Sequence, residues 1–177
     1  MEDKPPVEGD KAVYEETLYY GPWLWVLVVG LIALYVAVLI GAVAKGQGWL
    51  GAVFGVIVVA LIALLANFWR LDFVITGAQV IFGFGLIKKR FELSDVQSCE
   101  PYTLEFRNYY GYGIRSGRDG TIAYNTRNGR GIKLVAAGRR KPYVVSLDDP
   151  KRVCELILGV RSDLISRGQV PGSSDAD

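Results

Sequence analysis

Two stretches in the first half of the chain are continuously apolar. Trp23–Ala44 and Trp49–Trp69 contain no charged residue, and only Lys45-Gly46-Gln47-Gly48 lies between them. A helix needs about 20 apolar residues to cross roughly 30 Å of hydrocarbon, and it satisfies its own backbone hydrogen bonds there. Because the connection is so short, the pattern predicts two antiparallel helices, a transmembrane hairpin over residues 21–69.

The ends of the two stretches carry aromatic residues, and their interiors carry small ones. All four tryptophans of the chain lie at these ends: Trp23, Trp25, Trp49 and Trp69. Indole rings there favour the headgroup level of a bilayer and would anchor the hairpin. Small residues recur every fourth position in Ala33-Ala37-Gly41 and in Gly51-Gly55, which predicts a close seam between helices. Two interpretations of Gly51-xxx-Gly55 stay open, packing of the hairpin on itself or homodimerisation.

After the hairpin the pattern changes from continuous to alternating. Leu71, Phe73 and Ile75 face one way with Asp72 and Thr76 opposite, which is typical of a half-buried strand. Further strands are expected at Gln79–Phe84, Lys88–Leu93, Val96–Tyr102, Gly113–Arg115, Thr121–Tyr124, Ile132–Val135 and Tyr143–Ser146. Parallel strands would need crossover helices, for which the short connections leave no room, so we expect an antiparallel sheet.

One helix is expected at the end of the chain. Asp148 or Asp149 would cap it and Pro150 suits its first turn. Apolar residues then recur on one side at helical spacing: Val153, Leu156, Ile157, Val160 and Leu164. An antiparallel barrel of about seven strands, capped by this helix, would bury that stripe and protect the sheet edges. The expected fold class is an α+β membrane protein, with the helical hairpin preceding a β-barrel domain at residues 70–167.

Charge is distributed unevenly around the hairpin. Residues 1–20 are acidic and poor in apolar side chains, so we expect a disordered tail there and a second tail at residues 168–177. Arg70 to Asp177 hold seventeen Lys and Arg against twelve acids, whereas the loop between the spans holds only Lys45. Positive charge close to the spans sets their orientation. We therefore expect two spans in the inner cell membrane, with both termini in the cytoplasm.

The cytoplasmic placement decides the expected chemical state of the two cysteines. Cys99 and Cys154 have no CxxC spacing. In a reducing compartment the simplest expectation for such a pair is two free thiols rather than a disulfide or metal ligands.

Several segments of the chain resemble those of a known protein family. Two spans followed by Leu71-Asp72-Phe73-Val74-Ile75-Thr76, Tyr112-Gly113-Ile114-Arg115, Gly129-Arg130-Gly131-Ile132-Lys133-Leu134-Val135 and Asp148-Asp149-Pro150 resemble bacterial membrane proteins with a pleckstrin-homology-like domain. The resemblance implies a seven-stranded, strongly bent sheet with a C-terminal helix, acting as a binding module. Eukaryotic relatives bind phosphoinositides through basic residues between the first two strands. That loop is Thr76-Gly77-Ala78 here and has no basic residue, so no lipid-site residues carry over.

The residues that most enzymes use are missing or scattered. The chain has no histidine, which excludes His-based triads and His-ligated metals. It has no phosphate-binding P-loop, no GxSxG elbow and no cysteine pair at metal spacing. Asn67 is the one strongly polar side chain within the spans, and a helix-end amide explains it better than transport. We expect no catalysis, no cofactor and no metal.

Basic residues are the strongest remaining signal. Lys88, Lys89 and Arg90 form one cluster, and Arg139, Arg140 and Lys141 form another. Near an anionic leaflet each such residue is worth about 1 kcal/mol, so both clusters are candidate contacts for anionic lipid headgroups. The alternative is that the first only sets topology and the second is a solvated turn. Nucleic acid fits poorly, because acids are interspersed and no aromatic-basic strand motif occurs.

A second candidate surface is aromatic. Tyr109, Tyr110 and Tyr112 lie among glycines, and an exposed tyrosine cluster is typical of protein recognition. Packing within the sheet explains them equally simply. Two functions therefore stay open. The first is a non-catalytic membrane protein whose cytoplasmic domain binds a protein partner, and the alternative is a module that contacts anionic lipid.

Overall fold

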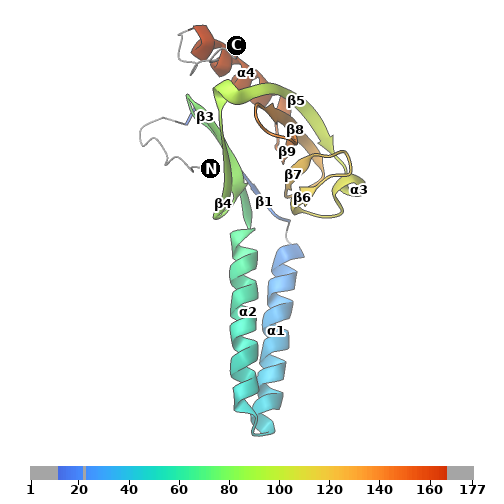
Figure 1. Ribbon diagram of the computed structural model, residues 1–177. Helices are drawn as coiled ribbons and strands as arrows, with labels where there is room; N and C mark the ends of the chain where they lie inside the picture. The colour runs from blue at the N-terminus through green and yellow to red at the C-terminus, as the bar shows by residue number, and fades with distance from the viewer. Residues whose placement is uncertain (1–11, 22, 167–177) are drawn as a thin grey trace.

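The first long helix has the predicted bounds, and the second is shifted by one or two residues from the predicted Trp49–Trp69. The structure, a computed structural model, describes residues 12–21 and 23–166. Helix α1 (Trp23–Ala44) and helix α2 (Gly48–Asn67) form an antiparallel hairpin that projects from the rest of the molecule (Figure 1). The buried share of the most apolar stretch is only 6% in α1 and 11% in α2. Both helices are therefore long and apolar enough to cross a membrane, and neither is buried like a core helix.

The seam between the helices differs from the predicted one on one side. A Cβ atom on Gly51 would lie 2.6 Å from Leu39 Cδ1, and one on Gly55 would lie 2.8 Å from the Tyr35 hydroxyl. Both glycines of α2 therefore face α1. The predicted seam residues of α1, which are Ala33, Ala37 and Gly41, lie on its exposed side. Within the hairpin, the glycines of α2 therefore receive large side chains of α1, and Ala33, Ala37 and Gly41 do not form this contact.

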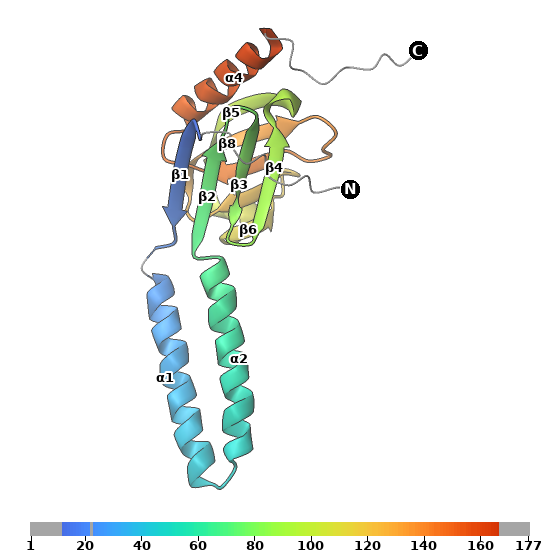
Figure 2. The ribbon, with the colours of Figure 1, turned by 90° about the vertical axis from the view of Figure 1, so that its left-hand side faces the viewer.

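A strand that we did not predict precedes the hairpin. Strand β1 (Tyr14–Tyr19) pairs antiparallel with β2 (Arg70–Ile75), from Tyr14 opposite Ile75 to Tyr19 opposite Arg70. The expected disordered tail at residues 1–20 is thus corrected for these six residues, and residues 1–11 lie outside the described part. The two helices continue directly into two paired strands (Figure 2).

The first sheet has the order β1-β2-β3-β4, with β3 (Gln79–Phe84) and β4 (Ile87–Glu92) joined by a tight turn. Its alternation is the predicted one, since Leu71, Phe73 and Ile75 are fully buried. Leu93–Asp95 forms a short 3-10 helix, η1, which leads into the second sheet.

The second sheet corrects the prediction of a closed antiparallel barrel. Its strands are β5 (Val96–Leu104), β6 (Gly113–Ser116), β7 (Ile122–Asn125), β8 (Gly129–Ala136) and β9 (Tyr143–Ser146), with the short helix α3 (Phe106–Tyr109) between β5 and β6. The order is β5-β8-β9-β7-β6, and β7 pairs parallel with β9. No crossover helix is needed, because strand β8 itself carries the chain back. Within the described residues, the strands thus form two separate sheets of four and five.

Aromatic side chains from both sheets fill the space between them. The Phe82 ring lies 5.1 Å from that of Tyr124 and 6.0 Å from that of Tyr143, measured between centroids. Helix α4 (Pro150–Ser166) closes the end of this core that faces away from the hairpin (Figure 1). Its predicted stripe packs there, with Val153 and Ile157 fully buried. The predicted cap is also present, since Asp149 Oδ1 accepts a hydrogen bond from the Arg152 backbone N–H at 3.2 Å.

The seam of the hairpin gives a first prediction. Leucine at both Gly51 and Gly55 should lower the midpoint of thermal unfolding of the full chain in detergent, because overpacking costs about 1–3 kcal/mol per site. The matched control is leucine at both Gly30 and Gly41, where nothing lies within 4 Å of an added Cβ. Equal midpoints for the two double variants would contradict this seam.

Candidate functional site

Several contacts hold the junction of the hairpin and the sheets. The Tyr20 backbone N–H donates to the Trp69 carbonyl at 3.4 Å, next to the β1–β2 pair. The rings of Trp25 and Trp69 meet edge to face with centroids 4.7 Å apart. The Leu86 backbone N–H donates to Asn67 Oδ1 at 2.9 Å. The amide oxygen of Asn67 therefore accepts a hydrogen bond at the helix end, the role expected from the sequence.

The turn between β3 and β4 lies directly against the end of α2. A Cβ atom on Gly85 would clash with Asn67 Oδ1, and the Gly85 φ of +43° is one that glycine favours. Leu86, beside it, is 94% exposed although it is fully apolar. Because its backbone N–H bonds to Asn67, this exposed apolar side chain lies level with the end of α2.

The predicted anchors sit at helix ends. Trp25 lies in the first turn of α1, Trp49 in the first turn of α2, and Trp69 just after α2. Trp25 and Trp49 are exposed. The side chain of Trp23 lies outside the described part.

The first basic cluster is divided between the two faces of β4. Lys88 Nζ lies 2.9 Å from Asp72 Oδ2, and Arg70 Nε lies 3.4 Å from Asp72 Oδ1. Gly83 stands between Asp72 and Lys88 in the strand register, and its missing side chain lets Lys88 reach across. Lys89, one residue on, points to the opposite face of the strand. Lys88, Lys89 and Arg90 are all exposed, and Lys88 forms an ion pair with Asp72.

The second basic cluster belongs to the second sheet. Arg139, Arg140 and Lys141 occupy the connection between β8 and β9. The Arg139 guanidinium lies over the Phe91 ring, 5.5 Å from its centroid. Phe91 is near the far end of β4, about 13 Å of strand beyond Ile87 at the turn. Arg139 therefore lies beside the residue that follows Arg90, at the end of β4 that points away from the helices.

The three predicted tyrosines have different surroundings. Tyr109 is buried, and its hydroxyl lies 2.9 Å from Thr121 Oγ1. Tyr110 is 59% exposed under the guanidinium of Arg118. Tyr112 packs edge to face against Tyr20, with centroids 6.3 Å apart. They do not form one aromatic surface, which corrects that candidate site.

A carboxylate orders the turn that covers Tyr109. Asp119 Oδ1 accepts hydrogen bonds from the Thr121 hydroxyl at 2.7 Å and from its N–H at 3.1 Å, and Oδ2 accepts one from Tyr102 at 2.8 Å. Burial raises the pKa of Asp119, but these hydrogen bonds outweigh it, so the pKa lies below the usual carboxyl value. The group is a structural anion, ionised at neutral pH.

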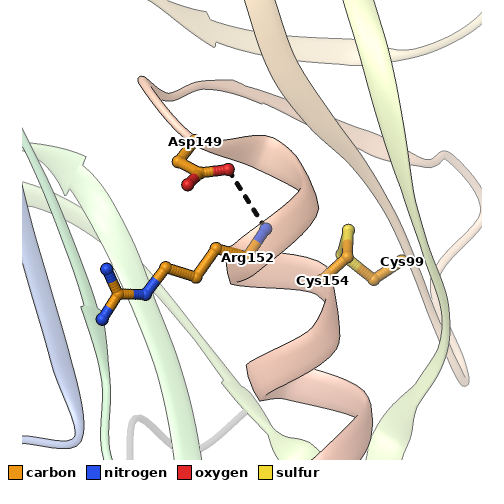
Figure 3. Close-up of a disulfide and its surroundings, with 4 residues drawn as sticks. All are labelled: Cys99, Asp149, Arg152 and Cys154. Atoms are coloured by element: carbon orange, nitrogen blue, oxygen red, sulfur yellow. Dashed lines mark hydrogen bonds between the residues drawn. A yellow bond between two sulfur atoms is a disulfide. The ribbon is translucent and has the colours of Figure 1, made fainter.

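The cysteines are bonded, which corrects the expectation of free thiols. Cys99 of β5 and Cys154 of α4 form a disulfide (Figure 3), with both side chains nearly buried. The bond fixes α4 on the second sheet. It also bears on location, because disulfides persist mainly in oxidising compartments.

One hollow at the junction was not visible in the sequence. It lies between the end of α2 and the segment 111–115, and Arg115 is the charged residue at it. No pattern in the sequence signals this site, because its two sides are more than forty residues apart in the chain. Among residues 12–21 and 23–166, no group of three or more His, Cys, Asp or Glu side chains is placed to hold a metal ion.

Comparison with family models, with curated proteins and with solved structures finds no match to this chain. The function must therefore be argued from the geometry alone.

Proposed function

We propose that this protein is a non-catalytic, membrane-anchored binding module. The hairpin α1–α2 crosses a bilayer, and the two sheets stand on its surface. Three observations support this: both helices are apolar and almost unburied, the tryptophans lie at helix ends, and Leu86 exposes an apolar side chain at the same level. Since the β1–β2 pair follows the helices directly, the sheet domain is held close to the lipid.

The orientation that we propose places both termini and the sheet domain in the cytoplasm of a cell with an inner membrane. Four basic residues lie within about 20 positions of α2 on the domain side, against Lys45 alone in the loop. The Cys99–Cys154 disulfide is the one feature that argues for the opposite orientation. Cysteine labelling in intact cells decides between the two.

For that measurement we would place single cysteines at Gln47 in the loop and at Ser162 on α4, both exposed. We expect a membrane-impermeant maleimide to label the Gln47→Cys chain and not the Ser162→Cys chain until the cells are opened. The wild-type chain serves as the blank, because its own cysteines are bonded and nearly buried. Labelling of Ser162→Cys alone in intact cells would reverse the orientation.

The open edge of β4 is the feature that best supports a protein partner. In the order β1-β2-β3-β4, strand β4 has a neighbour on one side only, and residues 87–90 are all exposed. An edge strand offers backbone donors and acceptors to an added strand. Because the edge carries Lys88, Lys89 and Arg90, an extended acidic segment is the partner that fits it.

Anionic lipid is the second candidate ligand, and Leu86 beside Lys88 favours it. Arg139–Lys141 lie farther along the domain, beyond the range of about 8–10 Å over which surface charge acts, so we do not include them in the proposed lipid contact. The pleckstrin-homology-like identity stays part of the proposal. Two sheets with one C-terminal helix support it, and the parallel pair β7–β9 does not.

The partner edge is testable by photocrosslinking in living cells. A benzoylphenylalanine in place of Lys89 should give one discrete protein adduct. We choose position 89 and leave Lys88 as lysine, because Lys88 pairs with Asp72. The control places the same group at Ser162, on the face of α4 away from the junction. Absence of an adduct from position 89, or the same adducts from both positions, would reject β4 as the binding edge. Substituting Arg90→Glu should weaken the adduct from position 89.

A further inference from the structure

The hollow at the junction has one apolar side and one polar side. It has a volume of about 450 Å³, and its walls come from the end of α2, from the segment before α1 and from the start of β6: Leu64, Leu65, Phe68, Tyr20, Gly111, Tyr112, Gly113, Ile114 and Arg115. In the proposed membrane placement, Leu64 and Leu65 lie in the last turns of a span. The apolar side of the hollow is then continuous with the hydrocarbon, and its polar side lies at headgroup level.

Arg115 is held in place at this hollow. Its Nε donates to the Tyr112 carbonyl at 3.2 Å. Gly111 leaves room for the guanidinium, because a Cβ atom there would lie 3.4 Å from Nε and 3.5 Å from Nη2. Among the described residues Arg115 makes no ion pair. The guanidinium of this exposed side chain is thus turned toward Tyr112 by one hydrogen bond and keeps donors for a ligand.

The Tyr20 phenol, another polar group of the hollow, is neutral. Burial raises the pKa of Tyr20 to about 12, although nearby Arg115 lowers it, so the phenol keeps its proton. The backbone at Gly111 is fixed from behind by buried Asn125, whose Nδ2 donates to the Gly111 carbonyl at 3.2 Å. Of the described residues that line the hollow, Arg115 is the only charged one. The site thus selects a ligand with one anionic group and an apolar body.

We propose that this hollow binds one anionic phospholipid, with its phosphate on Arg115 and the upper part of an acyl chain along Leu64, Leu65 and Phe68. Guanidinium groups bind phosphate through two parallel hydrogen bonds, which suits this pairing. The proposal rests on the membrane placement given above, but it does not depend on the β4 edge. One lipid molecule is bound in the hollow, which differs from a general attraction between an anionic leaflet and the basic clusters.

The test uses the full chain purified in a mild detergent and native mass spectrometry with dioleoyl phosphatidylglycerol. Wild type should retain one phosphatidylglycerol molecule at low lipid excess. Arg115→Gln should weaken that binding at least about tenfold, the loss expected for a charge-assisted hydrogen bond. The charge-matched control is Arg140→Gln, an exposed arginine in the β8–β9 connection, which should bind like wild type.

A second variant and its control test the apolar wall of the hollow. Leu64→Ala should weaken phosphatidylglycerol binding, because Leu64 lines the hollow. Leu61→Ala, one turn earlier on the same helix and outside the lining, should not. A disulfide that remains intact and an unchanged circular dichroism spectrum show that each variant is folded.

Three results would overturn the proposal. The first is equal lipid retention by wild type and Arg115→Gln. The second is an equal loss in Arg140→Gln. The third is a competition in which inorganic phosphate alone displaces the lipid with the same Arg115 dependence, which would reassign the site to a soluble phosphate compound. A different result would refute the membrane placement, and with it the proposed function. That result is a chain that stays in the supernatant when lysed cells are ultracentrifuged without detergent.

Discussion

A strand that precedes the first long helix pairs, residue for residue, with a strand that follows the second. Six residues of β1 lie opposite six of β2, and only residues 20–22 and 68–69 separate this pair from α1 and α2. Tethers this short leave the sheets little freedom to swing. The Asn67–Leu86 hydrogen bond adds a second point of attachment across the junction. Everything that we infer about function, from the edge of β4 to the hollow at Arg115, requires that the sheet domain be held at this fixed height.

The elements with a strong period could be predicted from the sequence, and those fixed by partners could not. The long helices α1 and α2, strands β2 to β9 and helix α4 follow from apolar runs and from alternation, so their bounds differ by a few residues at most, whereas the short helix α3 was not predicted. Strand β1 carries Glu15 and Glu16 and buries only Leu18, so its own pattern is that of a polar tail. It is a strand because β2 offers it a partner, and because Glu16 Oε1 accepts the Asp148 backbone N–H at 2.7 Å.

The same distinction holds for the sites. Sequence reasoning found the helix-end role of Asn67 and the cap at Asp149, which are local. It grouped Tyr109, Tyr110 and Tyr112 by their proximity in sequence, although the turn after α3 sends their side chains to different places. It missed the Cys99–Cys154 bond, which joins residues 55 positions apart, and the hollow at Arg115. Both depend on how β5, α4, α2 and β6 meet in space.

The most direct test of the rigid junction is a distance measurement by double electron–electron resonance. Spin labels at Gln47, in the loop between the helices, and at Thr103, on β5 of the second sheet, report on the whole molecule in lipid nanodiscs, since both positions are exposed. Because β1–β2 pairing joins the hairpin to the sheets without a flexible linker, we expect a single narrow distance distribution. A broad distribution, typical of a domain on a loose tether, would contradict it.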